Sequence, residues 1–142
     1  MRFNELYNQK ILEFISKNKC DLSNFSLQKI NSNIYNFTNL IELNLSENRI
    51  LFISSKIENL INLKTLNLSD NLIEELPSTL GNIADIENLF LAGNKLKKLP
   101  QTIINLKKLK WLSLLDNKEL MLSEEQKLWV EEIKNNGCRV LI

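Results

Sequence analysis

The sequence contains no histidine and only two cysteines, two prolines and three glycines in 142 residues. Without histidine, the usual Cys–His nucleophile pair and histidine-based metal sites are excluded. Two cysteines are too few for a Cys₄ zinc site, and no C-x-x-C pair or glycine-rich phosphate loop occurs. Carboxylates such as Glu74 and Glu75 fall on an expected surface turn, with no implied cleft. We therefore expect no catalytic residues, no cofactor and no metal.

Long apolar runs are also missing. No segment approaches the roughly 18 residues needed to cross a bilayer, and Asn4, Glu5 and Asn8 interrupt any signal-peptide core. The net charge of +1 favours neither nucleic acid nor acidic membranes. A content of 44% hydrophobic and 25% charged residues is typical of a globular chain. We expect a single domain over 1–142, located in the cytoplasm, with signal-independent export as the alternative.

What the sequence does contain is a repeat of 23 residues: 40–62, 63–85 and 86–108, with a partial unit at 109–122. Each unit opens with apolar and polar residues in alternation, which predicts a β-strand with one buried face. No unit can bury its leucine face alone, so neighbouring units must stack as parallel strands. One asparagine column is expected to form a buried ladder that satisfies backbone groups: Asn48, Asn71, Asn94 and Asn117.

The pattern L-x-x-L-x-L-x-x-N-x-L, followed by L-P-x-x-[LI]-x-x-L at Pro77 and Pro100, resembles the leucine-rich repeat family. Its length matches the 23-residue class found in many intracellular proteins. The resemblance implies an α/β fold, a right-handed βα superhelix with a parallel sheet on its concave face. The chain would return along the convex side as extended segments or short helices. The resemblance also implies that the concave face binds the partner.

The start of the chain departs from the repeat, and we expect it to cap the solenoid. Residues 1–19 place several apolar side chains on one helical face and predict a capping helix: Phe3, Tyr7, Ile11, Phe14 and Ile15. Residues 20–39 predict an irregular first repeat. Phe25 takes the ladder position there, so the ladder should begin at Asn48.

The far end, 123–142, predicts a second cap made of a helix and a short strand. Ser123 and Gln126 match a capping box at the start of this helix, and Gly137 suits its end. The apolar face of the helix is expected to consist of Leu128, Trp129 and Ile133.

The two cysteines fall at opposite ends of the predicted sheet. Cys20 occupies a core position of the first strand, and Cys138 begins the last. Five strand spacings separate them by roughly 24 Å, whereas a disulfide requires Cα atoms within about 7 Å. We expect two unlinked, mostly buried thiols and a reducing compartment.

The partner, expected to be another protein, would contact the exposed positions of the strands. The predicted partner-binding residues are Glu42, Asn44, Thr65, Asn67, Asn88, Phe90, Trp111, Ser113 and Leu115. Phe90 and Trp111 are diagonal neighbours on adjacent strands, and clustered exposed aromatics are typical interface anchors. The alternative is that the C-terminal cap covers Trp111 and Leu115. The predicted role is a non-enzymatic adaptor, inhibitor or regulatory protein.

Two other functions stay open. Seven lysines against one acidic residue in 95–118 form a basic rim, Lys95–Lys110, that could bind nucleic acid or a phosphate ligand. Ordinary solubilising charge explains the same lysines, so nucleic acid is not the expected partner. The last strand, 138–142, could leave an open sheet edge and make the protein a self-associating structural component. We expect a monomer, with an edge-strand dimer as the alternative.

Overall fold

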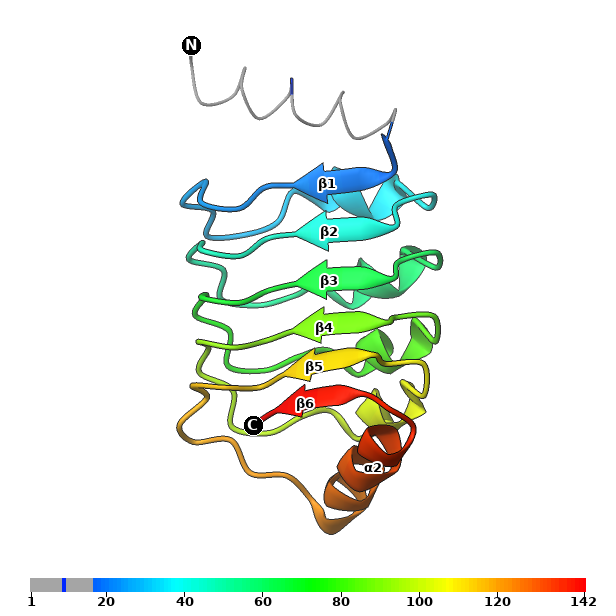
Figure 1. Ribbon diagram of the computed structural model, residues 1–142. Coiled ribbons are helices and arrows are strands. Elements are labelled where there is room, and N and C mark those ends of the chain that lie inside the picture. The colour runs from blue at the N-terminus through cyan, green and yellow to red at the C-terminus, as the bar shows by residue number, and fades with distance from the viewer. Residues whose placement is uncertain (1–8, 10–16) are drawn as a thin grey trace.

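The computed structural model of the protein describes residues 17–142 and, before them, Gln9. Within these residues, one parallel sheet contains six strands in chain order, β1 to β6 (Figure 1). The strands are β1 (Lys19–Asp21), β2 (Glu42–Asn44), β3 (Thr65–Asn67), β4 (Asn88–Phe90), β5 (Trp111–Ser113) and β6 (Arg139–Leu141). Each repeat contributes one rung of a stack, so the predicted α/β solenoid with a parallel sheet is confirmed.

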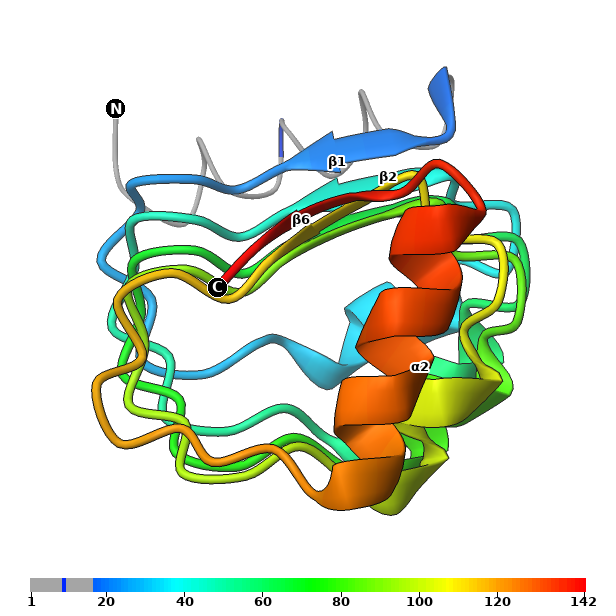
Figure 2. The same ribbon diagram turned by 60° about the horizontal axis from the view of Figure 1, so that its bottom comes forward.

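Four short 3₁₀ helices lie on the side of the stack away from the sheet (Figure 2). They are η1 (Ser32–Asn36), η2 (Ser55–Asn59), η3 (Ser78–Asn82) and η4 (Gln101–Asn105). Asn31 and Ser54 cap the first two through their side chains. Pro77 and Pro100 precede the other two in extended conformation, and their fixed φ suits the residue before a helical turn. Of the two expected return paths, the chain therefore uses short helices in each of these repeats.

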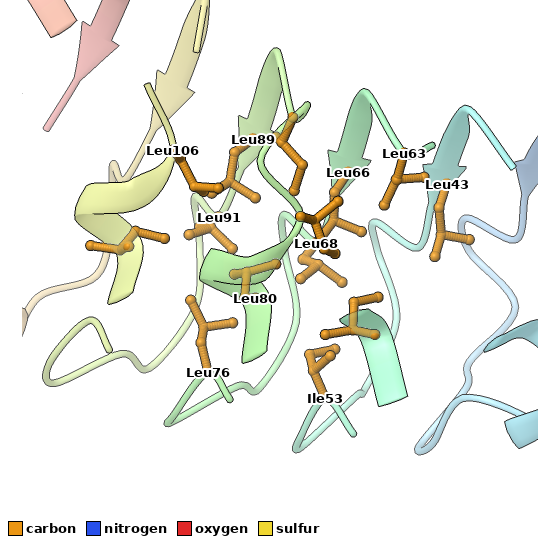
Figure 3. Packing of buried hydrophobic residues seen from close by; sticks show 14 of the residues in the cluster. Leu43, Ile53, Leu63, Leu66, Leu68, Leu76, Leu80, Leu89, Leu91 and Leu106 are labelled. Carbon is orange, nitrogen blue, oxygen red and sulfur yellow. The ribbon is translucent and has the colours of Figure 1, made fainter. Parts of the chain in front are cut away.

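The register of the strands follows the 23-residue period. Glu42 pairs with Thr65, and Thr65 pairs with Asn88. The strand leucines at the middle position are fully buried and stack against one another across the repeats (Figure 3). Full burial of each such side chain contributes about 1.5–3 kcal/mol, and this shared interior holds the repeats together.

The asparagine column runs beside this core where the chain leaves each strand. Asn71 is representative: its Nδ2 donates to the carbonyls of Leu45 and Leu68 at 2.9 and 3.1 Å. Its Oδ1 accepts from the backbone N–H of Ile50 at 2.9 Å. Asn48 makes the corresponding bonds to the first repeat, where its Oδ1 accepts from two backbone N–H groups. Each amide thereby links consecutive turns of the solenoid.

Helix α2 (Glu124–Asn135) lies across the C-terminal end of the stack, beside β6 (Figure 2). Ser123 and Gln126 form the predicted capping box, and Gly137 follows the helix with φ +90. The prediction for Leu128 was wrong, because this side chain is 71% exposed. The buried face instead consists of Gln126, Trp129, Val130 and Ile133. Their spacing defines a stripe that excludes position 128.

At the other end, the predicted capping helix over 1–19 lies outside the described residues, apart from Gln9 and its last positions. There Lys19 already belongs to β1, one residue earlier than the predicted first repeat. Cys20 and Cys138 are both buried, in β1 and directly before β6, and no disulfide joins them. In the described part of the chain, no helix has the length and apolar character needed to cross a membrane.

Candidate interaction surface

The first and third residues of each strand point away from the buried middle residue, since side chains alternate along a strand. Strand pairing arranges them in two rows across the sheet, which together are called the sheet face below. The first row runs Lys19, Glu42, Thr65, Asn88, Trp111 and Arg139. The second row runs Asp21, Asn44, Asn67, Phe90, Ser113 and Leu141. The predicted contact residues of β2 to β5 thus share one side of the molecule.

Hydrogen bonds orient the polar side chains of the earlier repeats. The Oδ1 atom of Asn44 accepts from the backbone N–H and the hydroxyl of Ser46, at 3.1 and 2.8 Å. Asn67 Oδ1 accepts in the same way from the backbone N–H of Ser69 at 3.0 Å. In the first row, Asn88 Nδ2 donates to the Thr65 hydroxyl at 3.0 Å. These residues offer a partner oriented polar groups.

The later repeats carry an aromatic patch made of Phe90, Trp111 and Leu115. The rings of Phe90 and Trp111 meet edge to face, with centroids 5.2 Å apart. Trp111 is 36% exposed and Leu115 is 39% exposed, while Phe90 is half-buried. The C-terminal cap covers Trp111 only in part, through Arg139, whose guanidinium carbon lies 4.6 Å from the ring centroid. Trp111 therefore stays exposed to a partner.

The structure corrects one predicted contact residue. Ser113 is only 6% exposed and cannot offer a partner much contact area. Its neighbours in the second row are Phe90 on β4 and Leu141 on β6, so a short side chain lies between two large ones. Arg139 was missed in turn. Its strand follows α2, so the 23-residue spacing does not give its register.

The predicted basic rim is largely neutralised by carboxylates of neighbouring elements. Lys110 contacts Glu87 at 2.6 Å and Lys107 contacts Glu132 at 2.5 Å. Three more lysines form ion pairs with acids one repeat earlier: Lys97–Glu74, Lys98–Glu75 and Lys108–Asp85. A groove beside the rim is lined by equal numbers of lysines and acids: Lys95, Lys97, Lys118, Glu74, Asp116 and Glu119. Such a surface lacks the excess positive charge that phosphate backbones require.

Among the described residues, resolved pKa shifts occur at a few surface groups and at one buried thiol. A hydrogen bond from Lys110 lowers the pKa of Glu87, and a hydrogen bond from Lys108 lowers the pKa of Asp85. Burial raises the pKa of the Cys138 thiol, which favours the unreactive protonated form. Over the described ranges, no three acidic or cysteine side chains gather as a metal site would require.

Comparison with known proteins agrees with this geometry. The family described as "Leucine rich repeat" matches residues 38–96. The chain therefore has the fold of a leucine-rich repeat solenoid. No curated protein matches its sequence.

Solved structures of several proteins share this fold. The solenoid is similar to a Leptospira interrogans protein, with TM-score 0.66 and 24% identity over 93% of this chain and 38% of that one. It is also similar to the ectodomain of the Arabidopsis thaliana receptor kinase SOBIR1, with TM-score 0.69 and 24% identity over 86% of this chain and 66% of that one. A plant peptide hormone receptor, RGFR1, solved in complex with RGF2, is 31% identical, with TM-score 0.58. That match covers 73% of this chain and 20% of the receptor. The solenoid spans less than two thirds of each of these proteins.

Proposed function

We propose that this solenoid is a non-enzymatic binding module that holds another protein against its sheet face. The observation that carries the proposal is the Phe90–Trp111 pair, two aromatic rings packed edge to face and partly exposed on a face that is mostly polar. Large rigid aromatics at the centre of a surface are the side chains that most often anchor a partner. The hormone receptor solved with RGF2 shows that a related solenoid can serve a binding role.

The other residues of the sheet face would set specificity. Phe90 and Trp111 anchor the partner, Leu115 extends the apolar contact, and the polar contacts come from Glu42, Asn44, Thr65, Asn67 and Asn88. A module of this kind acts as an adaptor, an inhibitor or a regulatory protein. We further propose a cytoplasmic setting, which two buried cysteines without a disulfide between them support.

The experiment is a paired substitution of the anchors. Phe90→Ala with Trp111→Ala should abolish capture of partner proteins from native lysate, because the apolar contact area is removed. Circular dichroism should show an unchanged fold, since neither ring belongs to the buried core. Captured proteins are identified by mass spectrometry and their affinities measured by calorimetry.

A matched control is available on another part of the repeat. Leu51 and Phe52 are 53% and 61% exposed and lie after the ladder, away from the sheet face. Leu51→Ala with Phe52→Ala should leave capture intact. Capture that survives in the anchor variant, or is lost in the control variant, would contradict the proposed site.

We also propose that the solenoid is a monomer. β6 ends the sheet on one side and is only three residues long, which offers little edge for pairing with a second copy. Light scattering at increasing protein concentration should give a constant mass. A mass that doubles with concentration would favour the edge-strand dimer.

A further inference from the structure

Arg139 is the one cation on or beside the sheet face of the described chain that has no carboxylate partner. Lys19 contacts Glu42 at 2.6 Å, and Lys64 and Lys110 both contact Glu87, at 3.4 and 2.6 Å. Among residues 17–142, Arg139 forms no ion pair; its contact is with the Trp111 ring at 4.6 Å. A positive charge is therefore left available directly beside the exposed indole.

The stacking also orients this charge. A guanidinium lying over an aromatic face keeps its N–H groups around the rim of the plane, where a carboxylate can accept two hydrogen bonds at once. Holding the side chain in place beforehand reduces the entropy lost on binding. Trp111 and Arg139 together can thus receive an apolar group and a carboxylate that lie next to each other.

The polar half of the sheet face adds two side-chain amide donors, on Asn44 and Asn67. Asn44 and Asn67 use their Oδ1 atoms within their own turns, so the oxygen is not offered to a partner. In the described part of the chain, neither Nδ2 group has a protein acceptor. No buried side-chain nitrogen or oxygen there lacks a hydrogen bond, so both amides reach solvent. These two N–H₂ groups, on adjacent strands, can therefore donate to acceptors of a partner.

We propose that the partner of this face is an extended acidic segment of a protein, with a carboxylate beside a large apolar side chain. The carboxylate binds the Arg139 guanidinium, the apolar side chain packs on Phe90 and Trp111, and backbone carbonyls of the segment accept from Asn44 and Asn67. This inference rests on the proposed function and names the chemistry of its partner. A basic segment would place its charge against Arg139 and lose affinity.

The test uses the whole chain and a random 12-residue peptide display library. Peptides that bind the wild type, and not the Phe90→Ala and Trp111→Ala variant, are sequenced. They should be enriched in Asp or Glu next to Leu, Phe or Trp. By fluorescence anisotropy, Arg139→Gln should weaken a selected peptide about tenfold, the scale of one lost charge-assisted interaction. Replacing that peptide's acid by its amide should weaken the wild type equally and leave the Arg139→Gln variant unchanged.

Arg49→Gln is the matched control, since Arg49 is exposed and lies outside the sheet face. It should bind like the wild type. Selected peptides without acids, or an equal loss in both arginine variants, would overturn the acidic partner while leaving the Phe90–Trp111 site in place. A library that yields no peptide dependent on Phe90 and Trp111 would overturn both proposals.

Discussion

At the scale of single residues, the asparagine ladder shows how one side chain type solves a recurring problem. The chain must turn out of each strand beside an apolar core, and buried backbone groups need partners there. An amide carries both donors and an acceptor, so Asn71 can satisfy carbonyls of two repeats and an N–H of one. Aspartate, threonine or alanine at this position would leave part of the set unsatisfied.

Asn71→Ala should destabilise the protein by about 2–4 kcal/mol, because it leaves several buried backbone groups without partners. Urea unfolding followed by circular dichroism measures the change. Asn105→Ala is the control, since Asn105 is exposed at the end of η4 and should change stability by no more than about 0.5 kcal/mol. Similar losses in both variants would show that the ladder has no special role.

At the scale of elements, η3 and η4 pack closely around a residue that has no side chain. Gly81 in η3 faces the backbone of η4: an added Cβ would lie 2.2 Å from the carbonyl oxygen of Thr102. Thr102 in turn donates its hydroxyl to the Ser78 carbonyl. The position is occupied by Glu58 one repeat earlier, so the glycine reflects this particular contact between η3 and η4.

Gly81→Ala should therefore destabilise the protein by about 1–3 kcal/mol through overpacking, although alanine favours helical backbone. Thermal unfolding measures it. Ser55→Ala, at an exposed position of η2, serves as the comparison and should have little effect. A stabilised Gly81→Ala protein would mean that η3 and η4 can separate without cost.

At the scale of the whole molecule, the solenoid is a row of repeats in which each depends on its neighbours. The last repeat has no following leucine layer, and α2 replaces it with Trp129, Val130 and Ile133. Trp129 is 2% exposed, and its indole N–H donates to the carbonyl of Leu106 at 3.4 Å. Helix α2 thus covers the core of the last repeat, as the leucines of a following repeat would.

Trp129→Ala should cost about 3–5 kcal/mol and release the C-terminal end first. Hydrogen exchange should rise in α2 and β6, while β2 and β3 keep most of their protection. Leu128→Ala provides a neighbouring control on the same helix, with a side chain that is 71% exposed. Uniform loss of protection along the chain would contradict unfolding from the cap.

Ion pairs also connect the repeats, and they predict that the stability of the protein decreases in acid. The pKa of Glu87 and that of Asp85 are lowered in the folded protein. Their contribution is therefore complete above the ordinary carboxyl pKa and is lost as the pH falls through the lowered values. In the variant with Asp85→Asn and Glu87→Gln, the urea midpoint should decrease less below about pH 4 than in the wild type. The difference should be small, because the ion pairs are exposed. If the urea midpoint of the double variant fell with pH as steeply as that of the wild type, these ion pairs would not contribute to the acid sensitivity of the protein.

The amino-acid sequence by itself determined the repeating parts of this protein. A leucine alternation that returns every 23 residues can be buried only by stacking, so the strands, their register and the asparagine column follow from the period. The capping box of Ser123 and Gln126 is equally local, since both partners lie within one helical turn. Contacts within one repeat, or between residues 23 apart, can therefore be predicted from the spacing of residues in the sequence.

The tertiary structure decided what happens where the period ends. α2 interrupts the count, and only the packed chain pairs Trp111 with Arg139 and Ser113 with Leu141. That pairing buries Ser113 and sets a cation over the indole. The rotation of α2 that exposes Leu128 is likewise fixed by the shape of the core it covers. These features depend on contacts between segments whose spacing no repeat specifies, and they give the proposed interaction surface its chemical character.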